Sequence, residues 1–187
     1  MKKTIDFVNR QATGGKVLFF LAAQLLVQGI FMFKLSPKFK EYSNGIEVLD
    51  LSPFYGVEYV KQLFGSTSEA GLHFYLYYFF TLDLIFPLMY AFSYGLIAAY
   101  LLKKLNLTEM TYQWLILLPF ASAFFDYGEN FGMAAMILSH PNFSEKIALF
   151  TTIFSSLKAG SAFAGGGVLI VLSFVLLGRK ITRKNLT

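Results

Sequence analysis

The sequence has no cysteine and little charge. The absence of cysteine from all 187 residues excludes disulfides, thiolate nucleophiles, iron–sulfur ligation and covalent haem attachment. Charged residues make up only 14% of the chain and hydrophobic residues 56%, whereas a soluble domain has about 25% charged residues. This composition predicts a membrane protein.

Four long apolar runs hold most of the hydrophobic residues. They cover residues 17–33, 74–102, 110–138 and 147–178, and each is near or above the roughly 20 residues that a spanning helix needs. We therefore predict an all-α, polytopic membrane four-helix bundle that forms a single transmembrane domain over residues 1–187. The long connection at residues 34–72 is expected to form an outer loop with a short interfacial helix.

Basic residues gather on one side of the predicted spans. Ten of the sixteen Lys and Arg residues precede the first run, lie between the second and third, or follow the fourth. The positive-inside rule then places both termini in the cytoplasm of a multi-pass protein. The formal net charge of +5 is interpreted as a topology signal and a contact with the lipid bilayer. We expect no nucleic-acid partner, because no basic stretch interleaves with an aromatic platform.

Charged side chains interrupt three of the apolar runs. Asp83 lies in the second run, Asp126 and Glu129 lie in the third, and Lys158 lies in the fourth. Four such groups facing lipid would cost about 10–14 kcal/mol, so they must face one another or water. With a rise of 1.5 Å per residue, all four lie roughly 13–18 Å from the outer ends of their helices. The sequence therefore predicts one polar layer in the outer half of the membrane.

We predict that this layer is a site, open to the outer face, that acts on or binds a lipid-like or small polar ligand. The candidate catalytic residues are Asp83, Asp126, Glu129 and Lys158. In the enzyme interpretation the carboxylates share acid and base work and the lysine stabilises negative charge. The candidate ligand-binding residues are Asn130, Gln24, Tyr90 and Ser155.

Carboxylate oxygens also suit a hard cation. Asp126 and Glu129 are the predicted metal ligands, and magnesium, calcium, manganese or sodium would be the ion. The two histidines, His73 and His140, lie at the outer edge of the predicted bundle. Zinc and haem are therefore not expected.

Other function classes stay open. Asp83, Asp126 and Glu129 could instead relay protons or bind sodium in a coupled transporter or ion pathway. A non-catalytic assembly subunit is the third class. Its supporting feature is the Gly/Ala-rich stretch at residues 159–167 of the fourth run, through which a homo-oligomer could form. The polar groups could also merely fix the register of the helices.

The order of these features resembles a group of small bacterial four-span membrane proteins that have no assigned activity. The pattern reads, in chain order, Asp83 with Pro87 and Tyr90, then Asp126 through Asn130, then Lys158. It covers roughly residues 45–173. The resemblance implies the four-span layout and a bacterial inner membrane, and it implies no substrate. Signal peptidase II is a poor match, because its asparagine- and glycine-rich motifs around the aspartates are absent.

Overall fold

The computed structural model describes residues 1–184, which form helices and connecting turns without a strand. Within these residues, three helical segments are long and apolar enough to cross a membrane: Gly14–Tyr42, Glu69–Lys104 and Glu145–Thr182. The all-α prediction is confirmed. The four-span bundle and its membrane setting stay predictions.

The third predicted span is not among the three. It consists of α8 (Met110–Gln113), the 3-10 turn η4 (Trp114–Leu117) and α9 (Leu118–Leu138). Asp126 and Glu129 interrupt its apolar run, and both are buried by neighbouring helices. Neighbouring helices therefore bury the charged side chains of this segment.

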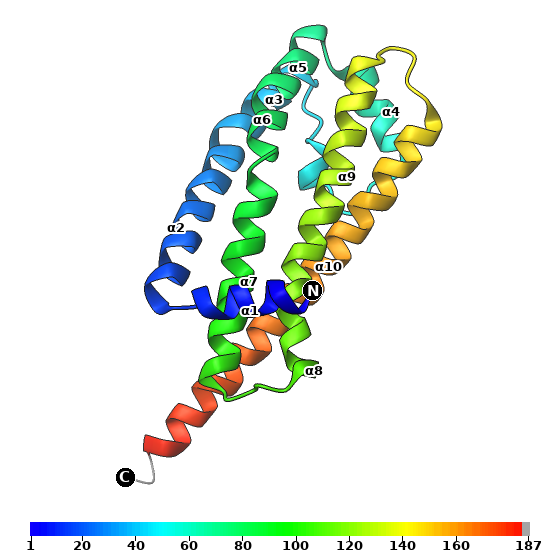
Figure 1. The fold of residues 1–187 in the computed structure, drawn as a ribbon. Coiled ribbons are helices and arrows are strands. Elements are labelled where there is room, and N and C mark those ends of the chain that lie inside the picture. Colours follow the sequence, from blue (N-terminus) through cyan, green and yellow to red (C-terminus); the bar gives the residue numbers. More distant parts are fainter. Residues whose placement is uncertain (185–187) are drawn as a thin grey trace.

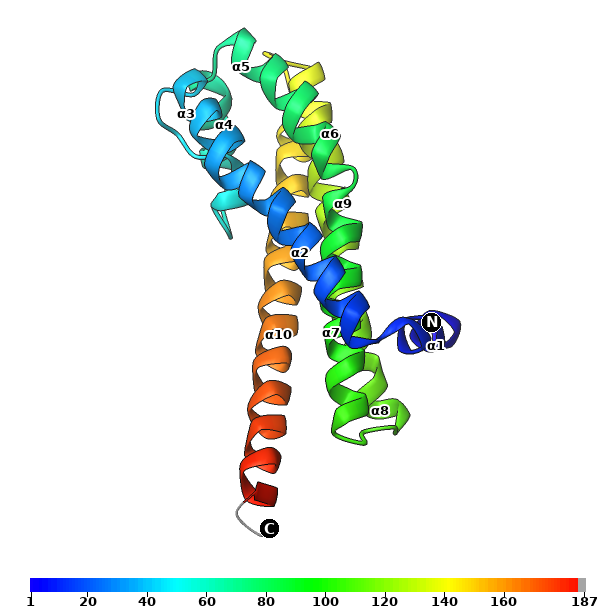
Figure 2. The same ribbon diagram turned by 90° about the vertical axis from the view of Figure 1, so that its left-hand side faces the viewer.

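Four helical columns run side by side through the described residues (Figures 1 and 2). In chain order they are α2 (Gly14–Ile30) with η1 (Phe31–Leu35) and α3 (Ser36–Tyr42); α5 (Glu69–Phe74) with η3 (Tyr75–Phe79), α6 (Phe80–Asp83) and α7 (Phe86–Lys104); α9; and α10 (Glu145–Lys184). α9 packs along α10 and α7, and α2 packs along α7. Comparable packing between α2 and α10 is not found in the part of the chain that the structure describes.

The two ends of the bundle differ. The N-terminus, the last turns of α10 and the turn between α7 and α8 lie toward one end (Figure 1). The other end is covered by the segment between α3 and α5, residues 43–68, which we call the capping segment. It contains the 3-10 turn η2 (Leu49–Leu51) and the helix α4 (Val57–Ser66), whose Val60, Leu63 and Phe64 are buried. The predicted short helix is therefore present, and its place at a membrane surface stays a prediction.

The chain begins with an amphipathic helix that we did not predict. α1 (Lys2–Gln11) crosses the α7 column in Figure 1 and lies to one side of it in Figure 2. Ile5 and Val8 are buried in an apolar cluster with residues of α7 and η4. Their spacing of three places both side chains on one helix face, so the basic residues around them occupy the opposite, exposed face.

The second column breaks next to Asp83. Pro87 has no amide proton to donate to the carbonyl oxygen of Asp83, and the helix is interrupted at Leu84 and Ile85. The freed carbonyl of Asp83 accepts a hydrogen bond from Asn130 Nδ2 at 3.4 Å. α9 therefore supplies a side chain that satisfies the break.

Candidate functional site

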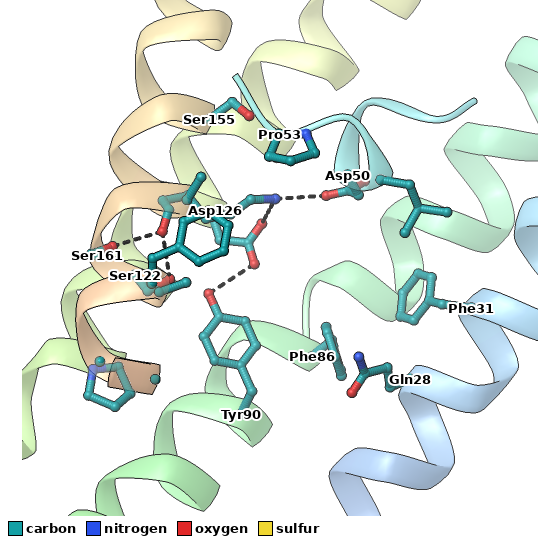
Figure 3. Close-up of a pocket in the computed structure, with 18 of the residues that line it drawn as sticks. Gln28, Phe31, Asp50, Pro53, Phe86, Tyr90, Ser122, Asp126, Ser155 and Ser161 are labelled. Atoms are coloured by element: carbon teal, nitrogen blue, oxygen red, sulfur yellow. Dashed lines mark hydrogen bonds and ion pairs between the residues drawn. The ribbon is translucent and has the colours of Figure 1, made fainter. Parts of the chain in front are cut away.

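Lys158 lies among three carboxylates. Its Nζ is 2.5 Å from Glu129 Oε2 and 3.2 Å from Asp126 Oδ1. These two acids stand three residues apart on α9 and therefore share one face of that helix. The third acid is Asp50, whose Oδ1 is 2.9 Å from the same Nζ. It comes from η2 in the capping segment, and Figure 3 shows its side chain pointing toward Asp126. We call Lys158 and these three acids the ion cluster.

Hydrogen bonds from tyrosines hold each acid of the ion cluster in place. Tyr90 donates to Asp126 Oδ2 at 3.0 Å, as Figure 3 shows. Tyr75 donates to Asp50 at 3.3 Å, and Tyr55 of the capping segment donates to Glu129 Oε1 at 2.8 Å. Burial, followed by the negative charge of the glutamate, raises the pKa of Tyr55 above its ordinary value. Its phenol therefore stays protonated and remains a donor.

A cavity of about 690 Å³ lies beside the ion cluster. It is bounded by α2, α6, α7, α9 and α10 and by residues of the capping segment. Six of the eight predicted site residues line it: Gln24, Asp83, Tyr90, Asp126, Ser155 and Lys158. The structure thus brings most of the predicted polar layer to one cavity wall.

Glu129 and Asn130 do not line this cavity. Glu129 is only 1% exposed, because Lys158 and Tyr55 cover its carboxylate. Asn130 bonds to the broken backbone at Asp83. Glu129 was predicted to be catalytic and Asn130 to bind ligand, and both roles stay predictions. Their contacts would let Glu129 position Lys158 and Asn130 position the backbone at Asp83.

Asp83 stands apart from the ion cluster. It is 5% exposed and lines the cavity, but no ion pair joins it to Lys158 within residues 1–184. Its Oδ2 has no hydrogen-bond partner among the described side chains and backbone. Asp83 therefore offers an unpaired acceptor in the wall of the cavity.

α2 supplies a second acceptor to the cavity. Gln24 of α2 is 1% exposed, and its Nε2 donates to Tyr94 at 2.9 Å and to Gln28 at 3.1 Å. Its Oε1 has no partner in the described part of the chain. A buried amide oxygen without a donor is costly, so a ligand that donates there would be stabilised.

Small residues of α10 widen the cavity. Gly165 and Gly166 line it, and a Cβ added at Gly166 would meet no atom within 4 Å. The tightest glycine contacts lie instead on α9, where a Cβ at Gly128 would collide with Phe154 and one at Gly132 with Thr151. The Gly/Ala-rich stretch of α10 therefore forms part of the cavity, and an oligomer through it stays a prediction.

The three acids of the ion cluster are close enough to share one cation. One oxygen atom from each of Asp50, Asp126 and Glu129 lies within 4.8 Å of the others. Asp50 thus joins the two metal ligands that were predicted. The ammonium of Lys158 already contacts all three carboxylates, so the chain supplies a cation of its own.

Sequence reasoning missed Asp50 and Tyr55. Both lie in the capping segment, which we expected to be an outer loop. The available signal was the apolar character of residues 46–51, since a solvated loop rarely places several aliphatic residues around one acid. Val48 and Leu49 are in fact buried, and they draw Asp50 inward.

Comparison of the chain with protein-family models, with curated proteins and with solved structures found no match. Its function is therefore inferred from the geometry of the site.

Proposed function

We propose that this chain is a four-span integral membrane protein that binds an amphiphilic, lipid-like ligand in the cavity beside the ion cluster. The observation that carries the proposal is the cavity itself, because it joins buried charged groups to apolar walls. Its volume of about 690 Å³ is typical of small-molecule sites, which range over roughly 300–1,000 Å³. A polar headgroup would lie at the ion cluster and an apolar chain along the walls.

The cavity opens sideways between two apolar helices. Met32 of η1, which continues α2, and Phe163 and Ile170 of α10 line it although each is exposed. The spanning stretches of α2 and α10 are each only 6% buried, as expected of helices that face lipid. In a bilayer, the opening between them would admit a lipid-like molecule laterally.

The proposed topology places α9 inside the membrane as the fourth span. α9 carries charge at a cost that its neighbours offset by enclosing Asp126 and Glu129. The N-terminus, the last turns of α10 and the α7–α8 turn lie toward one end (Figure 1), and ten of the sixteen basic residues lie in or next to those segments. The positive-inside rule assigns that end to the cytoplasm.

The cavity also suggests which groups would touch a ligand. Asp126 and Lys158 line it, whereas Glu129 lies behind the lysine. If the protein transforms its ligand, Asp126 is the group placed to exchange a proton, since Tyr90 and Lys158 fix its two oxygens. Glu129 would act through Lys158.

The acidic triad supports a second candidate, a cation-coupled pathway. Magnesium, calcium, manganese or sodium would bind Asp50, Asp126 and Glu129 after displacing the Lys158 ammonium. Removal of the lysine charge by Lys158→Met should then strengthen binding of these ions. The assembly role of the Gly/Ala-rich stretch stays a prediction.

A matched pair of glycine substitutions tests the amphiphile proposal. Gly166 and Gly167 are neighbours on α10, and a Cβ at either meets no atom within 4 Å, but only Gly166 lines the cavity. Gly166→Leu should narrow the cavity and weaken the binding of an alkyl-chain lipid about tenfold. Gly167→Leu should leave binding unchanged.

The measurement is native mass spectrometry of the full chain released from nanodiscs made of a total bacterial lipid extract. Wild type and Gly167→Leu should retain a bound lipid at collision energies that strip it from Gly166→Leu. Equal retention by all three proteins would contradict the proposal. Circular dichroism checks that both variants keep their helix content.

A further inference from the structure

The geometry points to a more specific ligand class: an amphiphile whose headgroup is an ammonium, received by Asp83. This inference rests on the proposed amphiphile site and adds the chemistry of its headgroup. It draws on three features of the cavity: its charge balance, its unpaired acceptors and its aromatic rings.

The charge balance disfavours an anionic headgroup. Four carboxylates belong to the cavity wall or to the ion cluster behind it, namely Asp50, Asp83, Asp126 and Glu129. Lys158 is the one basic residue among the described residues that line the cavity, and it is already paired with three of these acids. If all the acids are ionised, four negative charges face one positive charge. A phosphate would add to this excess, whereas an ammonium reduces it.

The unpaired atoms of the wall are both acceptors. Asp83 Oδ2 and Gln24 Oε1 lack a donor among residues 1–184, and their side chains line the same cavity from α6 and α2. An ammonium has three donor hydrogens and no acceptor, so it can donate hydrogen bonds to both atoms. It also supplies the positive partner that the Asp83 carboxylate lacks among these residues. A hydroxyl offers one donor without charge.

Aromatic rings line the same cavity as Asp83. Phe31, Phe79 and Phe86 line the cavity, and the ring centroid of Phe31 lies 5.6 Å from that of Phe79 and 5.3 Å from that of Phe86. Figure 3 shows Phe31 and Phe86 on the α2 and α7 sides of the cavity. The faces of such rings attract ammonium groups, and clusters of them recognise alkylated amines.

The binding mode follows from these positions. The ammonium would lie between Asp83 and Gln24 beside the phenyl rings. Lys158 would keep its own carboxylates, because their contacts are already formed at 2.5–3.2 Å. The alkyl chain would leave between α2 and α10, past Phe163 and Ile170.

The test compares three amphiphiles with the same twelve-carbon chain: dodecylammonium, dodecanol and dodecyl phosphate. Binding to the full chain in nanodiscs is measured by equilibrium dialysis of each radiolabelled compound. Gly166→Leu, with its cavity narrowed, measures partition into the bilayer and is subtracted. Dodecylammonium should bind more than about tenfold tighter than dodecyl phosphate, in line with the charge balance.

Two variants assign the ammonium to its residue. Asp83→Asn removes the charge with little change of shape and should weaken dodecylammonium binding more than about tenfold while changing dodecanol binding less than twofold. Asp6→Asn, on the exposed face of α1, is the matched control and should change neither. If Asp83→Asn fails to fold, Gln24→Leu removes the second acceptor and should weaken dodecylammonium binding in the same selective way.

The outcomes separate the two proposals. If no compound binds wild type better than Gly166→Leu, the amphiphile site itself is wrong. The ammonium headgroup is overturned, and the amphiphile site stands, if compounds bind but dodecyl phosphate binds as tightly as dodecylammonium or more tightly. The same holds if neither Asp83→Asn nor Gln24→Leu weakens dodecylammonium binding selectively.

Discussion

Replacing Lys158 by methionine removes the only cation from the ion cluster. Methionine has a similar length and no charge, so three carboxylates lose a partner that lies 2.5–3.2 Å away. The side chains of Asp126 and Glu129 are 6% and 1% exposed and cannot regain water. Breaking a buried pair in this way costs about 3–5 kcal/mol.

Asp50 should add little to this loss. Its side chain is 25% exposed, so it can turn toward water, and exposed pairs contribute only about 0–1 kcal/mol. A loss of about 3–5 kcal/mol is a large part of the 5–15 kcal/mol that stabilises a typical domain. Lys158→Met should therefore be folded but fragile in mild detergent.

A double-mutant cycle identifies the partner. Asp126→Asn combined with Lys158→Met should cost less than the sum of the single changes, with a coupling of at least about 1 kcal/mol. Asp83→Asn combined with Lys158→Met should be additive within about 0.5 kcal/mol, because no ion pair joins these residues in the described part of the chain. Reversible unfolding in mixed micelles, followed by circular dichroism, supplies the free energies of unfolding.

Two results would refute this reasoning. A loss below about 1 kcal/mol for Lys158→Met would mean that the lysine is not the counterion of buried acids. Additivity with Asp126→Asn would show that these two residues do not share an interaction.

Three further changes test other parts of the structure. Tyr55→Phe removes a buried donor and should destabilise by about 1–3 kcal/mol at pH 7; because the pKa of this phenol is raised, its contribution is full below about pH 10 and is lost at higher pH. Chemical denaturation should show a smaller difference in the free energy of unfolding between Tyr55→Phe and wild type at pH 11 than at pH 7. An equal difference at both pH values would count against the buried hydrogen bond. Gly128→Ala should lower the Tm, since its Cβ would strike a phenylalanine ring of α10 at a cost of about 1–3 kcal/mol, whereas Gly160→Ala, with open space around its Cβ, should not. Lys40→Cys and Asn106→Cys should react with an impermeant thiol reagent from opposite sides of the membrane, and labelling from one side would rule out the four-span topology.

The helical part of the site could be predicted from residue spacing. Asp126 and Glu129 stand three residues apart, so a helix places them on one face wherever that helix packs. The depths of Lys158 and Gln24 along their helices also follow from the constant rise of a helix. The prediction that all of these groups meet in one layer needed no knowledge of the tertiary structure.

The contributions of the capping segment could not be predicted in this way. Asp50 reaches Lys158, 108 residues away, through a turn whose path depends on the burial of Val48 and Leu49. Helix spacing also does not say which side of a polar face lies toward a cavity. Glu129, predicted to be catalytic, contacts a lysine, and Asn130, predicted to bind ligand, contacts a helix break.

The π-helical turns η1 and η3 make the number of residues in one column depend on the number in another. Each adds one residue to its helix, which rotates the part beyond it by about 100°. The turns lie beside each other, as the contact between Phe31 and Phe79 shows. On one side of them Gln24 faces the cavity, and on the other Phe39 enters the apolar core of the capped end. Deleting a residue from one column alone would turn its core residues away from their partners. Insertions and deletions in these two helices should therefore persist during evolution only as compensating pairs.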